Sequence, residues 1–237
     1  LCLTGQIATN MIGRGWGMLH EIPDQLAILR GLTKWAARIE HPTQVAAMIN
    51  EAFYQLNTGR PRPVALEIPP DILALETEVT LADAPAQYAS LAPDPQAIAR
   101  AAELLGQAEK PLILVGSGAD DAGDEVLAVA EMLQAPVVSA SNGRGVVSDQ
   151  HYLSIHGPGG HRLWAEADVV LGIGTRMQRP LTAWGTDSSL KIIRIDVDPS
   201  EFGRIQPPTL GIIADARPAL AALRQTLPAH NKPRASR

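Results

Sequence analysis

The sequence is poor in cysteine and has no long hydrophobic run. Cys2 is the only cysteine among the 237 residues, which excludes an intramolecular disulfide. The chain contains no run of about 20 uncharged apolar residues that could cross a bilayer, and it shows no charged, apolar and cleavable leader pattern. These absences predict a protein of a reducing, cytoplasmic setting that does not insert into membranes.

An excess of basic charge is also missing. The 20 lysines and arginines face 25 acidic residues, which gives a formal net charge of -5, and the basic residues are scattered along the chain. This distribution provides neither a basic face for nucleic acid nor a cationic helix for a membrane surface. Small molecules are therefore the expected partners. The 46% hydrophobic content is sufficient for one or two packed domains.

From residue 94 onward, short apolar runs alternate with helical patterns. The first helix of this part begins after Asp94, has Pro95 at its first position, and places Ile98, Ala102 and Leu105 on one stripe. Apolar runs that read as strands cover residues 112–115, 135–140, 167–174, 190–198 and 210–215. The alternation predicts a doubly wound parallel α/β sheet, that is, a Rossmann-like domain of residues 94–228.

Residues 1–75 instead predict an incomplete α/β half-domain. The runs LCLTG and PVALEIP read as strands, and only one long helix, residues 42–56, is expected between them. Two or three strands with one helix bury too little surface for an independent parallel sheet. Residues 76–93, rich in alanine and proline, are predicted to form an extended linker, and residues 229–237 a polar, frayed tail.

Glycine and polar residues follow the predicted strands of the second part at the points where these strands end. Ligands of open parallel sheets bind outside the carboxyl ends of the strands. Glycines there allow a phosphate to approach the backbone, an acid can accept ribose hydroxyl groups, and arginines can pair with phosphate. The residues concerned are Gly116, Ser117, Gly118, Ser141, Asn142, Gly143, Gly172, Gly174, Thr175, Arg176, Arg179, Asp196 and Asp198. Their coincidence at four strand ends predicts a nucleotide site.

A purely structural interpretation of each group stays open. The loop GSGADDAG carries Asp121 where a dinucleotide fingerprint has its third glycine, so its glycines could be simple turn formers. Asp196 could cap the turn that follows it, and for Asp198 capping is the favoured interpretation. His156 and His161 in HGPGGHR have no carboxylate or cysteine at metal-ligand spacing, so a loop is favoured over a metal site.

Six segments, taken in order, resemble the thiamine diphosphate-dependent enzymes of the acetohydroxyacid synthase (acetolactate synthase) type. They are TGQIATNMIG, LTKWAARI, NTGRPRPVALEIPPD, LILVGSGA, ADVVLGIGTRM and IIRIDVDPSEFG. The resemblance implies that residues 1–75 are the second half of a pyrimidine-binding domain. It also implies that residues 94–228 are the family's central domain, which binds FAD in some members, ADP in others and nothing in several. The activating glutamate and the magnesium-binding GDG motif of the family are absent here, which implies an internal fragment that is inactive alone.

The intact enzyme implied by this resemblance is a 2-keto-acid carboligase or decarboxylase, hence a transferase or lyase, that uses thiamine diphosphate and Mg2+. In such enzymes the cofactor ylid attacks the keto acid, carbon dioxide leaves, and the resulting carbanion is transferred or protonated. Active sites of the family form between subunits, which implies a homodimer or homotetramer. The uncovered half-domain predicts self-association of the fragment as well.

Individual residues of this chain match positions of the family. Gly5 and Gln6 match a strand end that faces the active site, although Gln6 could equally be a polar residue beneath it. Arg60 matches an arginine that reaches FAD in flavin-binding members, with a turn arginine as the alternative. The residues that match flavin-nucleotide contacts of those members are Gly116, Ser117, Gly118, Gly174, Thr175, Arg176, Asp196 and Asp215.

Three departures from the synthase pattern matter more for the substrate than for the fold. GMLHE replaces DAFQE, which puts His20 in place of a pocket glutamine. His20 could serve as an acid or base near neutral pH, or be a solvated loop histidine. IPPD replaces IPKD, with Pro70 in place of a lysine, and RMQRP replaces RFDDR, which removes two acids. These departures argue against acetolactate synthesis and against tight FAD binding.

Two other functions remain open on the sequence alone. A stand-alone module that binds FAD or NAD without catalysis would explain the complete doubly wound domain, but not the incomplete first part. A nicotinamide dehydrogenase is disfavoured, because the glycine fingerprint is broken and no acid ends the strand expected to hold the ribose.

Overall fold

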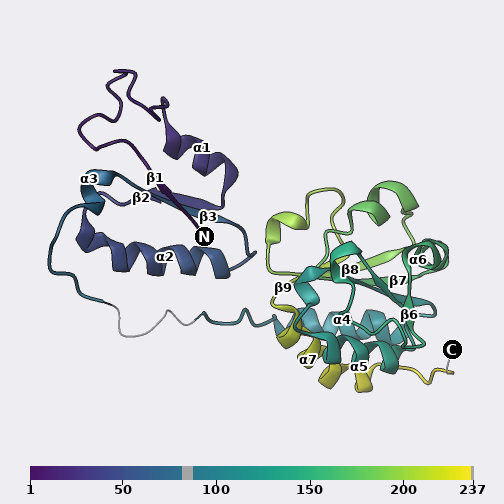
Figure 1. Ribbon diagram of the computed structural model, residues 1–237. Coiled ribbons are helices and arrows are strands. Elements are labelled where there is room, and N and C mark those ends of the chain that lie inside the picture. Colours follow the sequence, from purple (N-terminus) through teal and green to yellow (C-terminus); the bar gives the residue numbers. More distant parts are fainter. Residues whose placement is uncertain (82–87, 236–237) are drawn as a thin grey trace. The chain divides into compact units, whose positions relative to one another are not determined.

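Figure 1 shows the protein as a computed structural model that describes residues 1–81 and 88–235. The chain divides into two compact units, Leu1–Ala89 and Ser90–Arg237. The division falls within the predicted linker of residues 76–93, of which 82–87 lie outside the described residues. No helix in the described part of the chain is long and apolar enough to span a membrane.

The first unit is built on a three-stranded parallel sheet in the order β1-β3-β2. Helices α1 and α2 lie on opposite faces of this sheet (Figure 1). Its elements are β1 (Cys2–Gly5), α1 (Gln25–Leu32), β2 (Trp35–Arg38), a 3-10 turn (Pro42–Gln44), α2 (Val45–Asn57), β3 (Val64–Ile68) and α3 (Pro70–Leu73). The small core toward α2 consists of Ile39, Ala52, Val64, Leu66 and Ile72.

The apolar surface of the first unit is only partly covered. Strand β1 is an edge strand, and Leu3 on it is 57% exposed. Helix α1 has no buried residue, and its Leu32 is 75% exposed. The parallel α/β fold of this unit is as predicted, and that it is half of a larger domain stays a prediction, with which this exposed apolar surface agrees.

The one long helix predicted between the two strands of the first unit is present as α2 with its preceding 3-10 turn, and the shorter helix α1 and strand β2 lie there in addition. Helix α1 begins after Asp24, whose carboxylate accepts a hydrogen bond from Ala27 N at 2.9 Å. Strand β2 contains two alanines, which have low strand propensity, and it pairs with β3 in the register Trp35↔Val64. Tertiary pairing therefore places β2, and local sequence preference does not.

The second unit is a doubly wound domain around a parallel sheet, as predicted. Its six strands have the order β6-β5-β4-β7-β8-β9. The elements are α4 (Pro95–Gln107), β4 (Pro111–Val115), a 3-10 turn (Ser117–Ala119), α5 (Gly123–Leu133), β5 (Val137–Ser139), a 3-10 turn (Ser141–Gly143), β6 (Ser154–Ile155), α6 (Gly157–Trp164), β7 (Val169–Ile173), a π-helix (Pro180–Trp184), β8 (Lys191–Asp196), a 3-10 turn (Pro199–Glu201), β9 (Leu210–Ile213), α7 (Ala216–Thr226) and a 3-10 turn (Leu227–Ala229). The two-residue strand β6 is the strand that sequence analysis missed.

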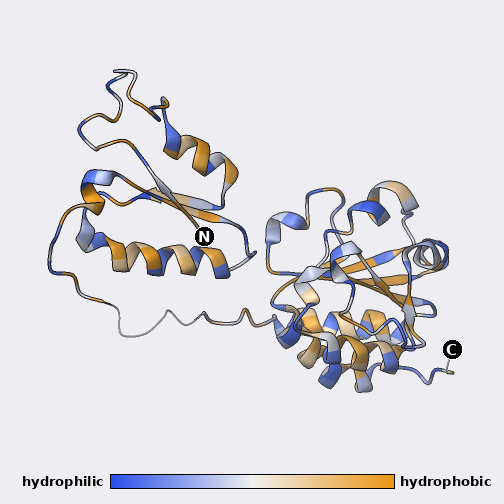
Figure 2. Ribbon diagram, viewed as in Figure 1, coloured by the Kyte–Doolittle hydropathy of each residue, from blue (hydrophilic) through white to orange (hydrophobic). Residues whose placement is uncertain are grey.

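Helices cover both faces of this six-stranded sheet (Figure 1). The face toward α4, α5 and α7 carries the larger core, to which Ile113, Leu171 and Ile193 belong. The face toward α6 and the π-helix carries a second core that includes Leu112 and Trp164. Figure 2 shows hydrophobic strands between helices whose outer sides are hydrophilic. Burial of both faces explains why the strands read as continuous apolar runs.

The C-terminal tail is docked over its described part, residues 229–235. The guanidinium of Arg234 donates to the carbonyl oxygens of Leu105 (2.9 Å), Gly106 (3.1 Å) and Ala108 (2.8 Å). These carbonyls lie at the end of α4, where a cation is favourable. The prediction of a frayed tail is therefore wrong for these residues.

Candidate functional site

The loops that follow β4 and β7 meet at the carboxyl edge of the six-stranded sheet. Gly118 N donates to Gly174 O at 3.1 Å, and Gly116 N donates to Ile173 O at 3.0 Å. Gly174 has a φ of +55°, in the left-handed region that favours glycine. A Cβ on Gly118 would lie 2.7 Å from Gly174 Cα. The close packing of the two loops therefore explains these glycines, and the N–H groups of Gly116 and Gly118 are already bonded.

Asp196 and Asp198 both stabilise the turn that follows β8. Asp196 Oδ1 accepts from Asp198 N at 3.0 Å, and Asp196 is 9% exposed. Asp198 Oδ1 accepts from Ser200 N at 3.1 Å and from Ser200 Oγ at 2.6 Å. The capping interpretation of Asp198 is thus confirmed. Asp196 makes a capping bond and lies at the ligand edge of the sheet, and its contact with a ribose stays a prediction.

Asp215 fastens the beginning of the second unit to helix α7. Its Oδ2 accepts from Leu91 N at 2.6 Å and from Ser90 Oγ at 2.9 Å, while Asp215 N donates to Leu91 O at 2.9 Å. This carboxylate oxygen is therefore committed to holding the chain where it enters the domain.

A buried arginine in β8 joins two loops of the carboxyl edge, and sequence analysis missed it. Arg194 is 1% exposed, and it donates to Glu201 O at 2.6 Å and to Thr175 O at 3.1 Å. Burial lowers the pKa of Arg194, against the opposing effect of the charges of Asp196 and Glu201. The sequence signal was a single charge inside the apolar run IIRI, because burying a charge is costly unless it is paired and hydrogen-bonded.

Two exposed arginines flank the buried carboxylate of Glu201, which is 1% exposed. Arg176 Nε lies 3.5 Å from Glu201 Oε1, and Arg204 Nε donates to Glu201 Oε2 at 3.0 Å. The hydroxyl of Thr175 accepts from Met177 N at 3.2 Å and is turned into the loop. The carboxyl edge therefore presents an arginine rim, Arg176 and Arg204, that is suited to an anion.

In the first unit, the side-chain amide of Gln6 is bonded at both ends. Its Oε1 accepts from Ile7 N at 2.8 Å, and its Nε2 donates to Glu67 Oε2 at 3.3 Å. Glu67, at the end of the central strand β3, is fully buried. It also accepts from Gln25 Nε2 at 2.9 Å and from Arg38 Nε at 2.5 Å. No local sequence pattern points to Glu67 and Arg38, because their contacts join segments far apart in the chain.

His20 and Arg60 do not lie together in the first unit. His20 is exposed in the loop between β1 and α1 and has a φ of 70°. The neighbouring Glu21 accepts from Met18 N at 2.9 Å and Gly15 N at 2.8 Å, and these backbone donors lower the pKa of its carboxyl. Arg60 precedes β3, at the amino edge of the sheet, whereas the loop of His20 leaves from the carboxyl edge.

The two histidines of HGPGGHR have local structural roles. His156 precedes the first residue of α6, and His161 stacks on Trp184 with the ring centroids 5.3 Å apart. Among residues 1–81 and 88–235, no cluster of three or more His, Cys, Asp or Glu side chains could hold a metal ion.

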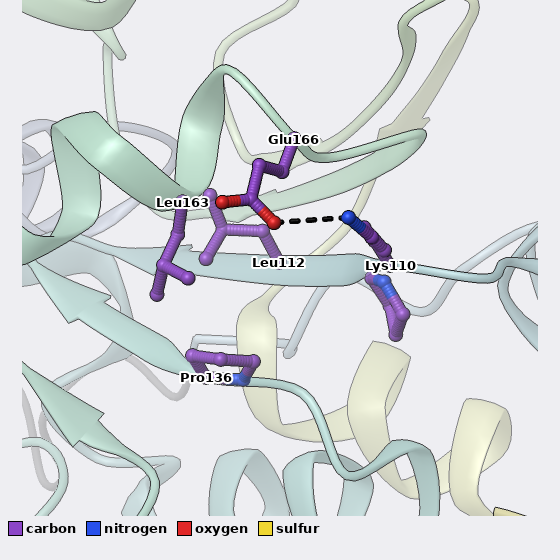
Figure 3. A pocket seen from close by; sticks show the side chains of 6 residues that line it. Lys110, Leu112, Pro136, Leu163 and Glu166 are labelled. Carbon is purple, nitrogen blue, oxygen red and sulfur yellow. Dashed lines mark hydrogen bonds and ion pairs between the residues drawn. The ribbon is translucent and has the colours of Figure 1, made fainter. Parts of the chain in front are cut away.

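Figure 3 shows a small pocket at the amino ends of β4 and β5. It is lined by Lys110, Pro111, Leu112, Pro136, Leu163 and Glu166. The ion pair between Lys110 Nζ and Glu166 Oε2, at 2.9 Å, is more than half exposed on both sides. This pocket lies at the edge of the sheet opposite to the glycine loops and the arginine rim, so it has no part in the predicted nucleotide site.

The fold and the strand-end loops place the chain in the class of parallel α/β proteins. Its doubly wound domain carries glycine loops, acids and arginines at the carboxyl edge of the sheet. The chain belongs to the thiamine pyrophosphate enzyme family, whose central-domain model matches residues 98–223. The matched residues lie within the second unit. The resemblance inferred from the sequence motifs is therefore confirmed.

Relatives with curated names are similar over nearly the whole chain. The chain is 34% identical over 224 residues to the probable 2-ketoarginine decarboxylase of Pseudomonas aeruginosa, with 92% of this chain and 40% of that protein covered. It is 30% identical over 241 residues to the acetolactate synthase large subunit of Corynebacterium glutamicum, with 95% and 38% covered. It is 31% identical over 240 residues to the glyoxylate carboligase of Escherichia coli O157:H7, with 94% and 39% covered.

A solved structure is also similar over nearly the whole chain. The X-ray structure of a candidate thiamin diphosphate-dependent enzyme isolated from Mycobacterium smegmatis superposes with a TM-score of 0.78 at 20% identity, with 94% of this chain and 45% of that chain covered. This likeness supports the parallel α/β fold. The chain spans less than half the length of each of these relatives.

Proposed function

We propose that this chain is the part of a thiamine diphosphate-dependent 2-keto-acid carboligase or decarboxylase that comprises half of its pyrimidine-binding domain and its central domain. The observation that carries the proposal is the family match over residues 98–223. Relatives named for decarboxylation and carboligation support it. The proposed boundaries are residues 1–75 and 94–228, joined by the linker of residues 76–93. When bound, thiamine diphosphate with Mg2+ would supply the electron sink for decarboxylation.

The residues of the first unit that fit a role near the substrate lie at the carboxyl edge of its sheet. Gln6 is held by Glu67, which suits positioning better than direct proton transfer. His20 is exposed and stands in a loop whose neighbouring Glu21 is fixed by backbone donors, so its imidazole is accessible to a ligand there. We propose that His20 contacts the substrate and that Gln6 orients the loop.

The fit of the central domain to a nucleotide is uneven. The N–H groups of Gly116 and Gly118 are already bonded in the loop packing, and Asp215 Oδ2 holds the chain entry, so these groups are not available to a ligand. The arginine rim of Arg176 and Arg204 suits a diphosphate. We therefore propose that an FAD or ADP, if this protein takes one, is held by the rim with Asp196 on the ribose, with Ser117, Gly174 and Thr175 as supporting loop residues.

Self-association also belongs to the proposal. The first unit exposes Leu3, Trp16, Leu19 and Leu32 by 57 to 81%. Such surface needs cover, and a second subunit of a homodimer or homotetramer would supply it.

The proposed function is tested by turnover. The intact protein that contains this chain is incubated with 2-keto acids, thiamine diphosphate and Mg2+, and carbon dioxide and carbonyl products are measured. Release of carbon dioxide that requires thiamine diphosphate supports the proposal, and the 237-residue chain alone is expected to give none. Turnover that is indifferent to thiamine diphosphate would refute it. A stand-alone nucleotide module, the alternative, would instead bind FAD or NAD tightly and release no carbon dioxide.

A further inference from the structure

Glu67 is a fully buried carboxylate that three side chains from three elements hold in place. Gln6 follows β1, Gln25 begins α1 and Arg38 ends β2, and their donor nitrogens lie 3.3, 2.9 and 2.5 Å from the Glu67 oxygens. Gln25 also donates to Gly5 O at 2.8 Å. The group therefore fixes the ends of three parallel strands and the start of a helix relative to one another.

Arg38 and Glu67 are direct cross-strand partners, so their side chains leave the same face of the sheet. Val64 and Leu66 belong to the core on the α2 face, which places Glu67 on the face toward α1. Both residues lie at the carboxyl ends of their strands, where open parallel sheets bind ligands.

The guanidinium of Arg38 is only partly used by this pair. Its Nε donates to Glu67, and its terminal N–H groups have no protein partner among residues 1–81 and 88–235. The side chain is 21% exposed, whereas that of Glu67 is fully buried. Glu67 thus fixes the orientation of Arg38 through Nε, and the two terminal nitrogens of the planar guanidinium are left for a ligand. Stability alone does not explain this arrangement, because apolar residues of similar volume are often at least as stabilising as a buried ion pair.

We infer that Arg38, oriented by Glu67, binds the carboxylate of the 2-keto acid. The inference rests on the proposed function and adds a residue to it. A guanidinium fork matches the two oxygens of a planar carboxylate. Glu67 already balances the charge of Arg38, so the site favours a singly charged anion over a phosphate. Glu67 is accordingly a positioning residue, and Arg38 a binding residue.

The test follows the Nε–H signal of Arg38 in a 15N-labelled 237-residue chain by NMR, with pyruvate as the probe. This proton is held by a buried carboxylate and is expected to give a separate resonance, assigned by its loss in Arg38→Lys. Saturable shifts with pyruvate and with acetate, but none with the neutral methyl pyruvate, are expected. No shift with pyruvate at concentrations near 100 mM, where even a millimolar Kd gives saturation, would overturn the inference.

Matched variants separate binding from folding. Arg38→Lys keeps the charge and loses the fork, so pyruvate affinity, followed in all variants by the backbone amide shifts of residues 38 and 67, should fall about tenfold, while Arg30→Lys on the exposed side of α1 should leave it unchanged. Glu67→Gln retains an acceptor and removes the countercharge, so it should let inorganic phosphate compete. Tighter binding of phosphate than of pyruvate by the unaltered chain would refute the carboxylate assignment. These results are independent of thiamine diphosphate turnover, so the inference can fail while the proposed function stands.

Discussion

Replacement of Arg194 by methionine tests whether the buried network organises the carboxyl edge of the second unit. The substitution removes two charged hydrogen bonds, to Glu201 O and Thr175 O, each worth about 1.5 to 3 kcal/mol. Methionine fills most of the volume and recovers about 1 to 2 kcal/mol through apolar burial. The difference predicts a loss of about 1 to 5 kcal/mol in the free energy of unfolding, since removal of one partner leaves buried acceptors unsatisfied.

Urea unfolding followed by tryptophan fluorescence measures this loss. Trp16 and Trp35 lie in the first unit and are replaced by phenylalanine, so that Trp164 and Trp184 report on the second unit alone. Arg176→Met serves as the control, because its side chain is 51% exposed and its ion pair should contribute no more than about 1 kcal/mol. A loss below about 1 kcal/mol for Arg194→Met, with an unchanged slope against urea, would refute the reasoning.

Three further predictions concern loop packing, acid stability and the tail. Gly118→Ala puts a Cβ 2.7 Å from Gly174 Cα and should cost about 1 to 3 kcal/mol in urea unfolding, whereas Gly5→Ala, with open space around it, should cost less than half as much. The hydrogen bonds from Ser189 lower the pKa of Asp187 in the folded state, so its stabilising effect exists above its unfolded pKa and disappears as pH falls below about 4. Asp187→Asn should therefore weaken the chain at neutral pH and flatten its acid unfolding curve, and an unchanged curve would argue against this cause. Arg234→Ala should speed amide exchange at the end of α4, because the carbonyls of Leu105, Gly106 and Ala108 lose the charged donor that ties the tail to them, and unaltered exchange would contradict the docking of the tail.

The sequence by itself determined the architecture of the second unit. Apolar runs bounded by glycine, the cap Asp94 and the stripe of Ile98, Ala102 and Leu105 are local signals, and strands buried on both faces make them strong. The family resemblance could also be read from short motifs in order. The adjacency of the loops after β4 and β7 followed from one rule, that parallel strands end at the same edge.

Only the tertiary structure decided how the residues at these edges are used. Strand β2 forms because it pairs with β3. Helix α1 forms because Asp24 caps its first turn and the helix packs on the sheet. Glu67 bonds Gln6 across 61 residues and Arg38 across 29, and no local pattern encodes such partners. Whether a glycine cradles a ligand or admits a neighbouring loop, and whether a buried charge is satisfied, depends on atoms brought together by folding, which sequence spacing alone does not specify.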